Sequence, residues 1–307
     1  MFDIAFKKPR SQIYSQLPEL ATSARQQRDL VRKKIKELDQ LSVSSSENSV
    51  PLSNSEELDQ SPVSSSKKSV PRPNSVLKLS DPDFETDLPF PFVGVETPER
   101  FNEHDENTWF YMGREKFTEL LDEFEKICKS TAHRDLMVYG TKGYGKSHLL
   151  AALVCYLTAR EQRVVYIPDC RLFFEHPVTH MISAMLFAWA DDESEQQNIM
   201  ALNTPEEIYE FFRFKKDVIF VIDQLNALER EREDEEAVVT DKVQMRKWLK
   251  GLRAPGRHKA ILSSSANNNS IHQGASRQSI NQIMYLYGGF TRVSIGSKYS
   301  FVKKRRF

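Results

Sequence analysis

The chain has 307 residues, of which 39% are hydrophobic and 28% charged, and its 43 basic and 43 acidic side chains give zero formal net charge. Its longest apolar run, Leu149–Leu157, is too short to span a bilayer, and its first residues lack the apolar core of a secretion signal. The three cysteines form no CxxC or Cys/His pair, so neither a zinc site nor a disulfide framework is indicated. These features predict a soluble, non-membrane protein of a reducing compartment.

The charges are concentrated at the two ends. Residues 1–36 carry nine Lys/Arg against three Asp/Glu, and residues 292–307 carry six against none, so the middle is acidic. The basic N-terminal segment, 1–36, is expected to be partly helical, because apolar residues fall on one side of a helix over residues 23–41. Its cationic cluster is Arg32, Lys33, Lys34 and Lys36. A solvated helix face is favoured over a nuclear import patch or a nucleic-acid contact.

A tandem repeat follows. Residues Glu37–Ser55 return as Glu57–Ser75 at a spacing of 20 residues, and both copies are rich in serine and proline. A unit with almost no apolar face cannot offset the entropy of ordering it. Residues 37–88 are therefore predicted to be a disordered linker.

A folded domain is expected over residues 89–291, before a basic tail at 292–307. An irregular arm, Phe90–Phe110, leads to an amphipathic helix, Met112–Lys129. Further helices are expected at 147–160, 177–190 and 240–252, and another begins at Thr204, where an N-cap, a first-turn proline and a capping-box acid occur together. Apolar strands are expected before Gly140 and at 163–168, 217–222, 259–263 and 282–286.

A phosphate-binding loop organises this domain. Gly140, Gly145, Lys146 and Ser147 fill the pattern G-x-x-x-x-G-K-[ST] between an apolar strand and an apolar helix. Glycines let the backbone curl so that several N–H groups face a polyphosphate at a helix N-terminus. The cofactor-binding set is Gly140, Thr141, Lys142, Gly143, Tyr144, Gly145, Lys146, Ser147 and His148. Lys146 is expected to contact the β- and γ-phosphates of ATP, and Ser147 to ligate Mg²⁺.

Polar residues at the ends of two later strands extend the site. Asp223 follows the apolar strand 217–222, where a second Mg²⁺ ligand is expected. Ser264, Ser265 and Asn267 follow the strand 259–263, where a polar side chain would orient the attacking water. The same string is equally well interpreted as an ordinary loop.

With these motifs in view, the chain resembles the P-loop ATPase domain of Crinkler-type effectors and retrotransposon hot spot proteins, within the AAA+/STAND-like group. The matching stretches are 111–115, 139–150, 165–170, 220–228, 264–267 and 287–291. The resemblance implies an α/β P-loop NTPase fold, with a five-stranded parallel sheet and helices on both faces. It also implies ATP and Mg²⁺ binding and delivery into a host cell, often its nucleus. By motif matching, Asn267 or Ser265 takes the sensor role, and Arg277 would be an arginine finger acting on a neighbouring subunit of a homo-oligomer.

Two departures keep a second function open. Gln224 stands where many AAA+ proteins have the glutamate that activates water, and Gln can orient a water but cannot accept its proton. The helical lid expected after residue 291 is not visible. A Mg²⁺-dependent ATPase that uses Gln224 and the 264–267 tip is one interpretation, and a nucleotide-binding module that does not hydrolyse is the other. Binding of nucleic acid or a host nuclear protein through the basic ends, especially Lys303–Arg306, is a third.

Overall fold

The structure is a computed structural model that describes residues 16–41, 71–94, 97–101, 107–131, 134–141, 143–231, 233–254, 258–265, 282–287 and 290–294. For residue 265 and the last two ranges it describes the backbone alone. The helices are α2 (Leu17–Gln40), α3 (Asn74–Ser80), α4 (Lys116–Lys129), α5 (Lys146–Ala159), α6 (Cys170–Glu175), α7 (Pro177–Ala188), α8 (Glu193–Met200), α9 (Pro205–Arg213) and α10 (Glu236–Arg253), with a 3-10 turn η1 (Leu225–Leu228). The strands are β1 (Glu85–Pro89), β2 (Thr108–Met112), β3 (Asp135–Gly140), β4 (Val164–Ile167), β5 (Ile219–Ile222), β6 (Lys259–Ser265), β7 (Gln282–Tyr287) and β8 (Phe290–Ser294).

The main sheet has the strand order β4-β5-β6-β3-β7-β8, and neighbouring strands are parallel except for the last pair. Strands β4 and β5 are buried along their whole length. Continuous apolar burial of this kind is typical of parallel strands that are covered on both faces. The five expected strands are present and run parallel to one another, but the expected sheet was incomplete, because β8 adds a sixth strand that runs antiparallel to β7.

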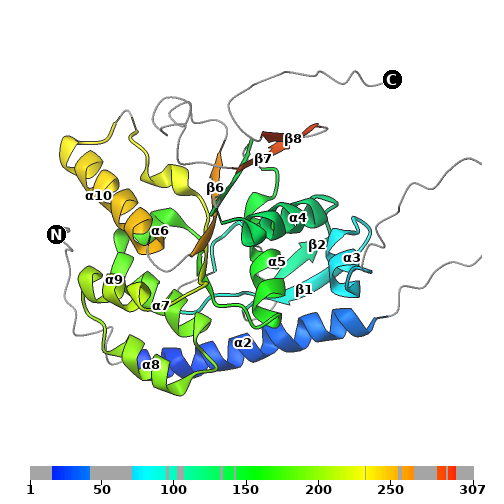
Figure 1. Cartoon of the computed structure of the whole chain (residues 1–307), viewed down its shortest axis with the longest axis horizontal. Coiled ribbons are helices and arrows are strands. Elements are labelled where there is room, and N and C mark those ends of the chain that lie inside the picture. Colours follow the sequence, from blue (N-terminus) through cyan, green and yellow to red (C-terminus); the bar gives the residue numbers. More distant parts are fainter. Residues whose placement is uncertain are drawn as a thin grey trace, which may run out of the picture.

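Helices cover both faces of this sheet (Figure 1). Helices α4 and α5 lie on one side, and α6, α9 and α10 lie on the other. Helix α5 is apolar all round, and ten successive residues from Leu149 to Thr158 are buried, as expected for a helix enclosed by the core. The predicted capping box of α9 is confirmed, since the Thr204 side chain accepts from the Glu207 backbone and the Glu207 side chain from the Thr204 backbone.

The folded part begins well before residue 89, where the sequence placed its start. Helix α2 packs against α5 and α7 (Figure 1), and its buried side chains, among them Val31 and Ile35, belong to the same core cluster as α5. Arg28 is also buried and donates to the carbonyl oxygens of Phe187 and Ala188 at the end of α7. The N-terminal segment is therefore part of the domain, because its apolar stripe needs a partner surface that only the tertiary fold supplies.

The predicted linker 37–88 was also wrong at both ends. Residues 37–40 finish α2, whereas α3 and β1 lie within the second half of the supposed linker, and β1 pairs with β2 as an antiparallel ribbon. The two repeat copies touch one another: Asp39 of the first accepts a hydrogen bond from the backbone N–H of Ser75 in the second, at 3.0 Å. The central part of the repeat, 42–70, lies outside the described residues.

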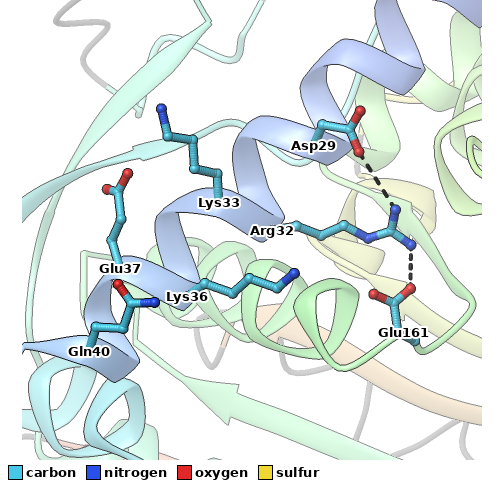
Figure 2. A pocket seen from close by; sticks show the side chains of 7 residues that line it. All are labelled: Asp29, Arg32, Lys33, Lys36, Glu37, Gln40 and Glu161. Carbon is cyan, nitrogen blue, oxygen red and sulfur yellow. Dashed lines mark hydrogen bonds and ion pairs between the residues drawn. The ribbon is translucent and has the colours of Figure 1, made fainter.

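The cationic cluster of α2 is divided between contacts and solvent. Arg32 forms ion pairs with Asp29, Glu161 and Asp191. Lys33 and Lys36 are exposed and line a surface hollow on α2 (Figure 2). These two lysines agree with the predicted solvated helix face. Within the described ranges, no helix is both long enough and apolar enough to cross a membrane.

Candidate phosphate-binding site

The predicted loop lies between β3 and α5, at the carboxyl end of a central strand. Gly140 is the last residue of β3, and Gly145 is the N-cap of α5 in the left-handed region, with φ 69° and ψ 24°. Gly143 also has a positive φ, 89°. Both conformations favour glycine, and they turn the chain so that the unpaired N–H groups of the first α5 turn face the loop. A helix N-terminus presented in this way is a ready site for phosphate.

Lys146 closes this loop on itself. Its ammonium donates to the carbonyl oxygens of Gly140 and Thr141, at 2.7 and 2.8 Å. Burial lowers the pKa of this ammonium, and the nearby carboxylate of Asp223 opposes the shift. The charge of Lys146 is therefore held within the loop, where phosphate oxygens could replace the two carbonyls as its acceptors.

Asp223 lies directly after β5, facing the start of α5. The residue is 1% exposed, and burial raises the pKa of its carboxyl, while Arg100 and then the hydroxyls of Ser147 and Ser263 act in the opposite direction. The structure thus brings together Ser147 and Asp223, the two residues predicted to hold Mg²⁺. They are adjacent because β3 and β5 flank β6 and all three strands end on the same side.

A second cation, Arg114, lies over the loop. It comes from the connection between β2 and α4, and a Cβ built at Gly145 would be 2.6 Å from its Cζ. Its Nε is buried and has no hydrogen-bond partner among the described residues. Arg114 therefore adds positive charge to the loop from an element far away in the sequence.

His148 faces an aromatic cluster instead of solvent. Its ring lies 5.0 Å from the ring of Phe101 and 5.3 Å from that of Trp109. Burial, and then the charges of Arg114 and Arg100, lower its pKa to about 4. The imidazole is neutral at physiological pH, so His148 packs the start of α5 against the β2 ribbon without adding charge.

Arg100 connects the ends of two neighbouring strands. It donates to Asp169 Oδ2 at 2.7 Å and to the carbonyl oxygen of Pro168, both of which follow β4. Its Nη2 also lies 3.6 Å from Asp223 Oδ2. Asp169 is 4% exposed and uses its other oxygen as the N-cap of α6, accepting from the backbone N–H of Arg171. One guanidinium thus balances two buried carboxylates beside the loop.

Gln224, the predicted water-orienting residue, is held by a side-chain contact. Its Oε1 accepts a hydrogen bond from Arg171 Nη2 at 3.0 Å, and its backbone is left-handed, with φ 56° and ψ 41°. A non-glycine residue at positive φ is uncommon. The backbone N–H of Gln224 donates to Asp223 Oδ1 at 2.8 Å, so this turn also fixes the Asp223 carboxylate.

The remaining predicted residues are only partly placed. Tyr144 is exposed at the loop, and Thr141 is half-buried within it. The backbone of Ser265 pairs with Gly140, which puts the end of β6 beside the loop. Lys142, Asn267 and Arg277 lie outside the described residues, so their predicted roles stay predictions.

Two buried oxygen atoms indicate that the site suits a phosphate and a divalent cation. Thr141 Oγ1 and Asp223 Oδ2 are both buried without a hydrogen-bond partner among the described residues. No described group of three or more His, Cys, Asp or Glu side chains could hold a metal ion. Mg²⁺ with a nucleotide usually takes only one or two protein ligands, besides phosphate and water. Ser147 and Asp223 match that requirement.

Sequence reasoning missed the three charged residues Arg100, Asp169 and Arg114. A polar residue after an apolar strand was the available signal for Asp169, the same signal that identified Asp223. Arg100 and Arg114 come from segments without periodicity. Arg114 lies in the stretch 111–115 that carries part of the family resemblance, but no role in the site was predicted for it.

Comparisons with protein families, curated proteins and solved structures do not identify a family for this chain. No family matches the chain, and no curated protein matches it, so neither comparison supports the resemblance to Crinkler-type effectors. Among solved structures, a DNA replication initiation factor is similar, with a TM-score of 0.32 and 16% sequence identity. The aligned part covers 56% of this chain and 44% of that one.

Proposed function

We propose that this chain binds ATP together with Mg²⁺ at the phosphate loop and hydrolyses it slowly. One observation carries the proposal: the loop that presents Lys146 and the α5 N-terminus lies directly against Asp223, with Ser147 beside its carboxylate. ATP, as opposed to another nucleoside triphosphate, is chosen because the motif resemblance implies it.

The loop presents positive charges and hydrogen-bond donors where a polyphosphate would bind. The backbone N–H groups of residues 143–148 would donate hydrogen bonds to phosphate oxygens. The Lys146 ammonium would donate to the same oxygens in place of the carbonyls of Gly140 and Thr141. Arg114 supplies a second positive charge over Gly145. A tetra-anionic ligand would thus meet two cations and a helix N-terminus.

Ser147 and Asp223 would hold Mg²⁺. When bound, the ion would neutralise charge on the β- and γ-phosphates. Asp223 is fixed for this role by the backbone N–H of Gln224 and by its place at the end of β5. Its buried Oδ2, which makes no hydrogen bond within the described part, is the ligand atom available to the cation.

Slow hydrolysis follows from the residue after Asp223. Gln224 can hold a water with its amide but cannot take a proton from it. Its Oε1 also accepts from Arg171, and a water would have to compete for that oxygen. The same contact favours the second candidate function, a nucleotide-binding switch without turnover.

Phosphate release by wild type, Lys146→Ala and Gln224→Glu tests the proposal. We expect slow release by wild type, less by Lys146→Ala, and more by Gln224→Glu, because a carboxylate there can act as a base. Equal phosphate release by wild type and Lys146→Ala would rule out ATP hydrolysis at this loop. Tight ATP binding without phosphate release would support the nucleotide-binding switch instead. Action in a host cell rests on the motif resemblance alone and is not included in this function.

A further inference from the structure

The position of Arg100 leads to an inference that rests on the proposed function. Its guanidinium lies between Asp169 and Asp223, at the ends of β4 and β5, and is anchored on the β4 side by the hydrogen bonds to Asp169 and Pro168. The contact with Asp223 is different, because Nη2 is 3.6 Å from Oδ2 and makes no hydrogen bond with it. Arg100 thus balances the negative charge of Asp223 but leaves its Oδ2 without a hydrogen bond, so that this oxygen can still accept a ligand.

Packing fixes Arg100 in this place. The next residue, Phe101, is 1% exposed and lies edge-on against Phe90 and Trp109, with ring centroids 4.9 and 5.3 Å apart. The Phe101 backbone N–H also donates to the carbonyl oxygen of Pro98. Arg100 is therefore carried on a well-anchored turn, and its side chain is only 22% exposed.

Lys146 lies near Asp223, and Arg171 Nε lies 3.6 Å from Asp169 Oδ1, but Arg100 pairs with both carboxylates. Loss of Arg100 would leave the two buried carboxylates with less compensating charge when no metal is bound. A divalent cation on Asp223 would meet the guanidinium as a like charge at close range. We propose that Arg100 is the resident counter-ion of Asp223 and must give up that carboxylate, while it keeps Asp169, when Mg²⁺ binds. Arg100 is thus a positioning residue that weakens the coupling between Mg²⁺ and nucleotide binding.

The proposal predicts how the charge at residue 100 changes that coupling. The coupling is the ratio of the ADP dissociation constants measured in EDTA and in Mg²⁺, by calorimetry on the full chain. Arg100→Gln should increase this ratio by about fivefold or more, because Mg²⁺ no longer competes with a fixed cation. Arg100→Lys keeps the charge and should remain close to wild type.

Two further variants separate this contact from general electrostatics. Arg114→Gln removes an equal charge that lies over Gly145 and forms no ion pair with Asp223 within the described residues. It should weaken ADP binding similarly with and without Mg²⁺, leaving the ratio unchanged. Asp169→Asn releases Arg100 toward Asp223 and should lower the ratio, while asparagine still caps α6. Asp169→Asn also tests the proposal if Arg100→Gln fails to fold.

The outcomes distinguish this inference from the proposed function. A wild type that binds no ADP would reject both. Mg²⁺-coupled binding by wild type, with an unchanged or lower ratio in Arg100→Gln, would overturn the role of Arg100 alone. An equal rise in Arg114→Gln, or a rise in Asp169→Asn, would likewise overturn it.

Discussion

Replacing Gly145 by alanine tests the geometry of the phosphate loop most sharply, because Gly143 provides a matched control. Both glycines have a positive φ, 69° and 89°, and alanine in that region costs about 1–2 kcal/mol of folding free energy. They differ in their surroundings. A Cβ at Gly143 would meet nothing within 4 Å, whereas one at Gly145 would be 2.6 Å from Cζ of Arg114.

The added cost of Gly145→Ala follows from this contact. An ordinary carbon–carbon contact is about 3.5–4.0 Å, so the guanidinium must move by roughly 1 Å. Since it is the far end of a flexible side chain, we expect it to yield at a further cost of about 1 kcal/mol. The expected loss of stability is therefore about 2–3 kcal/mol for Gly145→Ala and about 1–2 kcal/mol for Gly143→Ala.

Urea unfolding of both variants, in wild type and in an Arg114→Ala background, measures this difference. The gap between the two alanine variants should close once Arg114 is removed. Equal stabilities in the wild-type background, or a gap that survives in Arg114→Ala, would refute the placement of Arg114 over the loop.

Other parts of the domain make separate predictions. Burial lowers the pKa of His180 to about 4, so the unfolded chain takes up a proton below its ordinary pKa of about 6.5 while the folded chain does not. Stability should therefore fall as pH decreases from about 6.5 to about 4, with about 2 kcal/mol lost to this residue at pH 5, and unfolding of His180→Gln should lack that part of the slope. A slope identical to wild type would contradict this. Thr204→Ala removes the N-cap of α9 and should cost about 1 kcal/mol in urea unfolding, whereas Thr204→Ser should cost little. Equal stability of the two Thr204 variants would argue against the capping box.

Local sequence patterns predicted the strands of the parallel sheet. The features that were not predicted depend on packing between segments far apart in the sequence. The wholly apolar strand before Asp223 and the capping box at Thr204 carry their signals within a few residues, and both are present in the structure. The basic residues of α2 predict a segment separate from the domain, whereas its apolar stripe packs on α5 and α7.

The site shows the same division. The loop motif identified Lys146 and Ser147 from spacing alone, because the chemistry of a phosphate loop is confined to a few successive residues. Arg100 and Arg114 reach the site from the segments on either side of β2, and their positions depend on how the ribbon of β1 and β2 packs against α5. No local pattern encodes such a placement.

The most direct test of the central claim is calorimetric titration of ATP in Mg²⁺ into wild type, Lys146→Ala and Lys36→Ala. Lys36 is an exposed lysine of α2 and serves as the matched control for loss of a positive charge. We predict binding by wild type and Lys36→Ala, and a loss of at least about tenfold in affinity for Lys146→Ala, since a charge-assisted contact to phosphate is removed. Equal affinity in Lys146→Ala and wild type, or no binding by any of the three proteins, would contradict a nucleotide site at this loop.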